Sequence, residues 1–178
     1  MNFSDFENLV KTRQSCRDFN DKPLEKEIVD KIVKTARLAP SACNSQPWKL
    51  YCVTDNEKAE EVRNALTDAG KNTFLKNAKA FIAVAEKIMP LKEDVLRRFS
   101  PNHFVKYDVG EIIAYVTLAA ESMGVKSCII GWINTENLAA ALGLATDEQC
   151  NIVIALGYSD IPVREKVRLK EEQVIKYL

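Results

Sequence analysis

The stretch Ala39-Pro40-Ser41-Ala42-Cys43-Asn44-Ser45-Gln46-Pro47-Trp48 joins two regular elements in the first half of the chain. Its two prolines fix the backbone, because each locks its own φ angle and restricts the residue before it. Between them stand Ser, Asn and Gln side chains, which are neutral hydrogen-bond donors and acceptors. Such a loop can hydrogen-bond a polar heterocyclic ring without adding charge, although an ordinary connection between a helix and a strand has the same composition.

The residues on either side of this loop predict a helix and a strand. Apolar side chains recur every four residues from Leu24 to Ala36, which indicates one apolar helix face. We expect Pro23 to begin this helix and Pro40 to end it. After the loop, residues 48–54 alternate and are rich in β-formers, so they predict a strand.

Helical and strand periods keep alternating along the rest of the chain. Thr54 and Glu57 have the spacing of a capping box and predict a helix that ends at Gly70. We predict further strands at 81–85, 127–133 and 152–158, helices at 107–123 and 135–142, an irregular stretch at 88–105 and a charged, extended tail at 159–178 with a short helical end. This pattern favours one mixed domain of helices and strands over residues 1–178.

The predicted helix at 107–123 is apolar nearly all round over residues 112–120. A helix of this kind is buried in the core or against a partner. The tail at 159–178 has no core of its own, so it is stable only if it lies on something else, such as a second subunit. Both features predict a homodimer, the commonest oligomer.

Charge and composition exclude several classes of protein. Lys and Arg total 25 and Asp and Glu total 25, so the net charge is zero, which argues against a nucleic-acid or membrane-surface binder. No apolar run approaches the ~20 residues of a membrane helix, and the acidic stretch 1–7 is unlike a signal peptide. We therefore expect a cytoplasmic protein.

The cysteines and the histidine suggest neither disulfides nor a metal site. Five cysteines occur, an odd number without C-x-x-C spacing, which is typical of reduced thiols in a reducing compartment. His103 is the only histidine and lacks a ligand-like pattern around it. We expect no metal.

Two basic segments could bind an anion. Arg13-Gln14-Ser15-Cys16-Arg17-Asp18-Phe19 places two guanidinium groups and a hydroxyl just before a helix. Arg164-Glu165-Lys166-Val167-Arg168 places three cations on one side of an extended stretch. Taken singly, either segment could equally be a solvated surface, and the small residues of 127–132 could simply form a core strand.

In this order, these segments resemble the nitroreductase family. The family has R-R-S-x-R-x-F-like, A-P-S-x-x-N-x-Q-P-W, D-x-G, G-L-G-S-C-x-x-G-like and L-G-Y motifs. The chain matches them at Arg13 to Phe19, at Ala39 to Trp48, at Asp108 with Gly110, at Gly124 with Ser127, Cys128 and Gly131, and at Leu156-Gly157-Tyr158. The chain departs from the family at Gln14, where a second arginine is common, at Ile129, where tryptophan is common, and in a shortened stretch 86–105.

The resemblance implies an α+β, nitroreductase-like fold: a mostly antiparallel central sheet flanked by helices, with a long central helix at the dimer interface. It also implies FMN bound between the subunits. Arg13, Gln14, Ser15 and Arg17 would hold the phosphate, the ribityl chain and the ring edge, and Lys166 and Arg168 would add charge at the phosphate, with Arg164 as the alternative. Pro40, Ser41 and Asn44 would come from the other subunit, Asn72 would meet the pyrimidine side, and Ile130 and Gly131 would lie along the ring.

The implied activity is ping-pong hydride transfer from NAD(P)H through FMN to a small acceptor such as a nitroaromatic or a quinone. Arg17 is the candidate catalytic residue, as a cation placed where the reduced ring becomes negative. Three alternatives stay open: reductive dehalogenation or ene-type reduction on the same scaffold, a flavin-storing or flavin-sensing dimer without turnover, and thiol redox chemistry at Cys16, Cys43 or Cys128.

Overall fold

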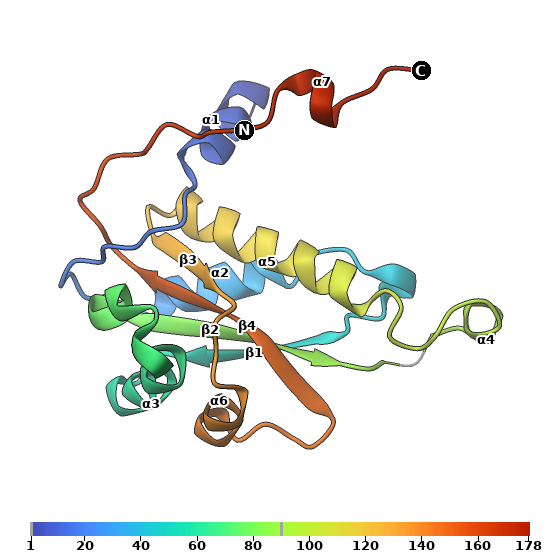
Figure 1. The fold of residues 1–178 in the computed structure, drawn as a ribbon, viewed down its shortest axis with the longest axis horizontal. Helices are drawn as coiled ribbons and strands as arrows, with labels where there is room; N and C mark the ends of the chain where they lie inside the picture. Colours follow the sequence, from blue (N-terminus) through green and yellow to red (C-terminus); the bar gives the residue numbers. More distant parts are fainter. Residues whose placement is uncertain (1, 90) are drawn as a thin grey trace.

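A four-stranded antiparallel sheet forms the centre of the computed structural model, which describes residues 2–89 and 91–178 (Figure 1). Its strands are β1 (Trp48–Val53), β2 (Ala80–Lys87), β3 (Lys126–Ile130) and β4 (Glu148–Gly157), in the order β1-β2-β4-β3. Each neighbouring pair is antiparallel. The predicted fold, a mostly antiparallel sheet flanked by helices, is confirmed.

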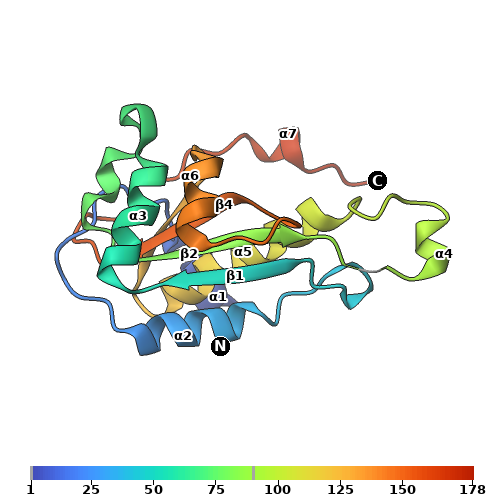
Figure 2. The same cartoon turned by 90° about the horizontal axis from the view of Figure 1, so that it is seen from below.

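Helices cover both faces of this sheet. Figure 2 shows α3 (Asn56–Leu66) and α6 (Thr135–Leu142) on one side, and α2 (Lys26–Ala36) on the other, where it packs against α5 (Val105–Ser122). The inner strand β2 contributes side chains to the core on both faces of the sheet. Phe81, Ala83 and Ala85 belong to the core cluster beneath α3 and α6, whereas Ile82 and Val84 belong to the cluster beneath α2 and α5. Burial on both faces explains why this strand is a continuous apolar run.

Several predicted boundaries need correction, starting with the second helix. The predicted capping box of Thr54 is wrong, because the N-cap of α3 is Asp55, whose carboxylate accepts the N–H of Lys58 at 2.9 Å. This helix ends at Leu66, and Gly70 instead closes a separate 3₁₀ turn, Asp68–Gly70. The spacing of Thr54 and Glu57 therefore places the start of the helix one residue too early, because the next residue, Asp55, is also a strong N-cap.

Other elements differ in extent from the prediction. The helix predicted between two prolines begins only at Lys26 and ends at Ala36, β3 ends at Ile130 rather than at 133, and β4 starts at Glu148 rather than at 152. The stretch 88–105, predicted as irregular, contains α4 (Glu93–Leu96). The remaining short elements are the 3₁₀ turns η1 (Ala42–Asn44) and η3 (Thr73–Asn77) and the helix α7 (Glu171–Val174).

The N-terminal helix α1 (Phe3–Thr12) was not predicted. A reciprocal capping box stabilises its start, since the Asn2 side chain accepts from the Asp5 N–H and the Asp5 carboxylate accepts from the Asn2 N–H, both at 2.9 Å. None of its residues is buried, and Phe3 is 79% exposed. This helix therefore depends on its caps more than on packing within the chain.

The long predicted helix and the extended tail are both present. α5 has 18 residues and spans about 27 Å, with Ile112 and Val116 fully buried and Tyr107 68% exposed. The tail leaves β4 and extends beyond the sheet to α7 (Figure 1), with Val167 90% and Tyr177 86% exposed. Within the described residues, no helix has the length and apolarity needed to cross a bilayer.

Candidate functional site

The N-terminal arginine segment lies as an extended chain against the edge of the sheet. Ser15 forms a parallel bridge with Ser127 of β3, and the Cys16 N–H donates to the Ser127 carbonyl at 2.9 Å. Gln14 and Cys16 are buried, while Arg13 and Ser15 are half-buried and Arg17 is exposed. The two-residue period of extended backbone thus places Arg13, Ser15 and Arg17 on the outer side.

The C-terminal tail returns to this segment. The Arg164 guanidinium donates from Nη2 to the Ser15 carbonyl at 3.0 Å, and the Lys166 ammonium contacts the Val10 carbonyl. Gln14 turns inward and hydrogen-bonds Pro162 and Arg164 of the tail. Two stretches separated by about 150 residues are therefore brought together, as the two basic motifs predict.

These two stretches enclose a cationic groove of about 280 Å³. It is lined by residues 13–15, Arg17 and residues 164–168, so five cations face one acid, Glu165. Partial burial lowers the pKa of Lys166, and the neighbouring charges of Arg13 and Arg168 lower it further. An anion in the groove would relieve that repulsion, and the guanidinium forks match the geometry of a phosphate.

An apolar groove of about 520 Å³ adjoins the cationic groove and shares Arg13, Lys166 and Arg168 with it. α5 contributes Gly110, Ile113, Ala114, Thr117 and Leu118, while α1 contributes Val10 and Lys11, and β3 contributes Ile129. Cations at one end and apolar walls along the other suit a flat molecule that carries a phosphate. Val10 and the α5 residues of this groove were not among the predicted site residues, because their lining role depends on tertiary packing.

Ile130, the last residue of β3, and Gly131, which follows it, differ in how they can contact a ligand. The Ile130 side chain is 3% exposed and belongs to the core, so only its backbone can lie along a ring. Gly131 is exposed, and a Cβ added to it would meet nothing closer than Ile152 Cδ1 at 3.7 Å. Ile129, at the position where the family commonly has tryptophan, is the side chain that reaches the apolar groove.

The proline-bounded loop does not reach either groove within one chain. Pro40, Ser41 and Asn44 are absent from both linings. Instead, the loop is anchored at the start of α5, where the Ala42 N–H donates to Asp108 Oδ1 at 3.0 Å. Asp108 is 4% exposed, and its second oxygen has no hydrogen-bond partner among the described residues.

Backbone strain accompanies this anchoring. Cys43, Asn44 and Gln46 have φ angles of 54°, 52° and 48°, in the left-handed region that residues other than glycine seldom adopt. The Gln46 N–H donates to Ser41 Oγ at 2.9 Å and closes the loop. Strain held by specific hydrogen bonds is a feature of ligand-binding loops.

Asn72 has a structural environment of its own. Its φ is 50°, and its Nδ2 donates to the carbonyls of Leu66 at 2.8 Å and Trp132 at 3.1 Å. It thereby ties the end of α3 to the chain that follows β3. Asn72 lines neither groove, so in a single chain the structure does not bring it to the cations.

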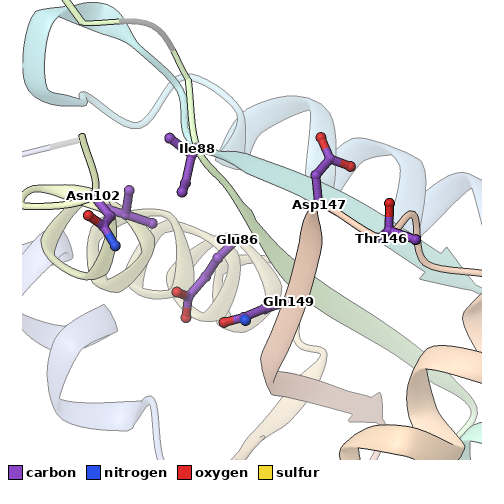
Figure 3. A pocket seen from close by; sticks show the side chains of 7 residues that line it. Glu86, Ile88, Asn102, Thr146, Asp147 and Gln149 are labelled. Atoms are coloured by element: carbon purple, nitrogen blue, oxygen red, sulfur yellow. The ribbon is translucent and has the colours of Figure 1, made fainter.

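A further pocket of about 320 Å³ lies near the start of α5 and is acidic (Figure 3). Glu86 accepts from Asn151 Nδ2 at 3.2 Å, and Asp147 pairs with the Lys87 ammonium at 3.4 Å. Its carboxylates would repel a phosphate. This pocket is therefore no candidate for a phosphorylated cofactor.

The thiols near the cations do not favour redox chemistry of their own. Cys16 and Cys128 are buried, and burial raises the pKa of the Cys128 thiol despite the nearby charge of Arg17. A reactive cysteine needs exposure and a lowered pKa. Among the described residues, no group of three or more His, Cys, Asp or Glu side chains is arranged to hold a metal ion.

The chain has relatives among known proteins. The model of the Nitroreductase family matches residues 10–72 and 59–158. A protein of Archaeoglobus fulgidus, named as a candidate NADH dehydrogenase/NAD(P)H nitroreductase, is 30% identical over 154 residues, which are 84% of this chain and 83% of that protein. Nitrobenzene nitroreductase of Ectopseudomonas oleovorans is 36% identical over 63 residues, which are 35% of this chain and 27% of that enzyme.

Solved structures show the same fold. A candidate nitroreductase from Exiguobacterium sibiricum 255-15, in complex with FMN, aligns with a TM-score of 0.85 at 20% identity and covers 100% of this chain and 99% of that one. The resemblance inferred from the short motifs is thereby confirmed over most of the chain. This protein belongs to the nitroreductase family, a family of oxidoreductases.

Proposed function

We propose that this protein is an FMN-dependent oxidoreductase that passes hydride from NAD(P)H to a small electron acceptor such as a nitroaromatic or a quinone. The observation that carries the proposal is the cationic groove, with five cations, opening onto the apolar groove along α5. A phosphate at one end and a planar ring system at the other match the two grooves. FMN supplies the hydride chemistry when bound, and the chain binds and orients it.

The outer side of the arginine segment would hold the phosphorylated part of the cofactor. Arg13 lines both grooves, so its guanidinium stands at their junction. Lys166 and Arg168 do the same from the tail. We assign these three cations, with Ser15, to the phosphate and the chain that follows it.

Arg17 has a different task in this proposal. It is exposed, lines the cationic groove but not the apolar groove, and has no acidic partner within 4.0 Å among the described residues. The proposal therefore requires the edge of the flavin ring to lie beside Arg17, where the two grooves adjoin. A guanidinium without a counter-ion can stabilise negative charge that develops on a neighbouring ring. We therefore keep Arg17 as the catalytic residue.

A homodimer would complete the site. Pro40, Ser41 and Asn44 line neither groove of their own chain, so a two-fold copy is needed for them to reach a bound ring. The exposed Tyr107 and Tyr115 of α5 and the exposed apolar tail offer surface for that contact. Sedimentation at micromolar concentration tests the dimer; a monomer that still holds flavin would refute it.

Turnover separates this proposal from its alternatives. The purified protein should oxidise NADH or NADPH steadily when a quinone is added. Retained FMN without turnover would favour a storage or sensing dimer, while reduction of halogenated or enoate substrates in preference to quinones and nitroaromatics would favour the dehalogenase or ene-type alternative. Activity that survives serine at Cys16, Cys43 and Cys128 would exclude the thiol mechanism.

A further inference from the structure

Gln14 has a buried side chain whose hydrogen bonds all go to the C-terminal tail. It is 7% exposed. Its Nε2 donates to the Pro162 carbonyl at 3.2 Å, while its Oε1 accepts from the Arg164 N–H at 3.1 Å and from Arg164 Nε at 3.4 Å. An amide can donate and accept at once, and this site uses both functions.

The start of the tail is held by Ile161, which packs against the core, and by a 2.7 Å hydrogen bond from Asn20 Nδ2 to Asp160 Oδ2, but beyond Ile161 few other contacts fix it to this chain. The contacts of Arg164 with the Ser15 carbonyl and of Lys166 with the Val10 carbonyl are exposed. The apolar side chains around them do not compensate, since Val163 is 45% and Val167 90% exposed. Gln14 is therefore the one buried side chain that fixes residues 162–164 to the arginine segment in the described structure.

Cations gathered around one groove repel one another, so something must hold the tail in place before an anion arrives. Gln14 lines the cationic groove, but its amide is already hydrogen-bonded to Pro162 and Arg164. We propose that Gln14 is a positioning residue, a clamp that seats Arg164 and the tail beside the groove, and that it affects cofactor affinity through Arg164 rather than through a hydrogen bond of its own to the cofactor. This inference rests on the proposed FMN function. Because linkage is reciprocal, a bound phosphate also strengthens the seating of the tail.

A double-mutant cycle tests the clamp through FMN affinity. Gln14→Leu keeps the apolar bulk but can neither donate nor accept, so it should raise the Kd for FMN about tenfold. In the Arg164→Ala background the same change should raise the Kd less than about threefold, because the group that Gln14 positions is already lost. An equal effect in both backgrounds, or none in the wild type, would overturn the proposal.

A matched control uses Gln173, an exposed glutamine of the same tail, whose Oε1 accepts from the Lys170 N–H at 3.1 Å. Gln173→Leu removes a tail hydrogen bond without touching the clamp, so the Kd for FMN should stay unchanged. A rise equal to that of Gln14→Leu would show that any disturbance of the tail weakens binding and would contradict a specific clamp.

Hydrogen exchange in flavin-free protein gives a readout that does not depend on the cofactor. The Arg164 amide should exchange faster in Gln14→Leu than in the wild type, and Gln14→Glu, which keeps an acceptor oxygen, should restore part of the protection. Unchanged exchange at Arg164 would refute the clamp. If wild-type protein binds no FMN but this exchange still responds, the clamp survives and the proposed function fails.

Discussion

Gly157 at the end of β4 packs so closely against Phe19 that adding a single methyl group to it should lower the stability of the fold. A Cβ built on Gly157 would lie 2.8 Å from Phe19 Cδ1 and 3.4 Å from Cγ, and the shorter distance is one that real Cβ contacts do not show. The Phe19 ring is 2% exposed. Its backbone is also fixed, since the Phe19 carbonyl accepts from Asn77 Nδ2 at 3.1 Å and the Asn20 N–H donates to the Tyr158 carbonyl at 2.8 Å.

Gly157→Ala should therefore destabilise the protein. Overpacking a core costs about 1–3 kcal/mol, and the better strand propensity of alanine returns about 0.5–1 kcal/mol, so the net loss lies between about 0 and 2.5 kcal/mol. Because the Phe19 ring is buried and its backbone is fixed, we expect about 1–2 kcal/mol of this range. Urea unfolding followed by circular dichroism would measure it, and the melting temperature should fall by about 2–8 °C. Since Phe19 ends the arginine segment, FMN affinity should fall with it.

Two further variants isolate the cause. Gly131→Ala makes the same chemical change where the nearest atom is 3.7 Å away, so stability should stay within about 0.5 kcal/mol of the wild type. In a Phe19→Leu background, Gly157→Ala should cost much less, because the smaller side chain leaves room. An undiminished cost there, or a Gly157→Ala protein as stable as the wild type, would refute the steric explanation.

Three other changes have defined outcomes. Arg17→Ala should weaken FMN retention and slow single-turnover hydride transfer in stopped flow; unaltered FMN content and rate would remove its catalytic role. The hydrogen bond from Tyr51, with help from Lys49, lowers the pKa of Glu148 from 4.5 to about 2. The ionised Glu148 therefore stabilises the fold fully above pH 4.5, and this stabilisation is lost as the pH falls towards 2. Tyr51→Phe should shift acid unfolding to higher pH, and an unchanged midpoint pH would contradict this. Asp108→Ala should lower FMN affinity several-fold by freeing the loop at 40–44, whereas Asp108→Asn, which keeps an acceptor, should lose less, as flavin fluorescence would report.

Local sequence patterns predicted the helices and strands whose positions follow from apolar periodicity and from capping residues. The pattern of apolar residues located α2 and α5, a β-rich alternating run located β1, and a short apolar run located β2, because these elements bury one face or both against the core. Capping residues located α3. α1 was missed because its helix has no buried residue, and only the Asn2–Asp5 capping box marked it. The Thr54 prediction failed because two adjacent residues, Thr54 and Asp55, could both cap a helix.

The candidate site likewise divides into features that local patterns predict and features that only tertiary packing decides. Charge alone brought the two basic stretches together as candidates, and the structure places them around one groove. Periodicity could not show that Gln14 points inward to the tail, that Ile130 is buried while Ile129 faces the groove, or that α5 supplies the apolar wall. Those facts depend on packing between separate segments, 150 residues apart for Gln14 and Arg164, which local patterns do not encode.

Binding of FMN compared with riboflavin, by calorimetric titration into flavin-free protein, tests most directly whether the five-cation groove takes a phosphate. Riboflavin carries the same ring without the phosphate. FMN should bind stoichiometrically, and at least about a hundredfold more tightly than riboflavin, with an affinity that falls as salt rises, because charge-assisted hydrogen bonds supply the difference. No binding of FMN, or equal affinities for the two flavins at every salt concentration, would contradict the assignment of the groove.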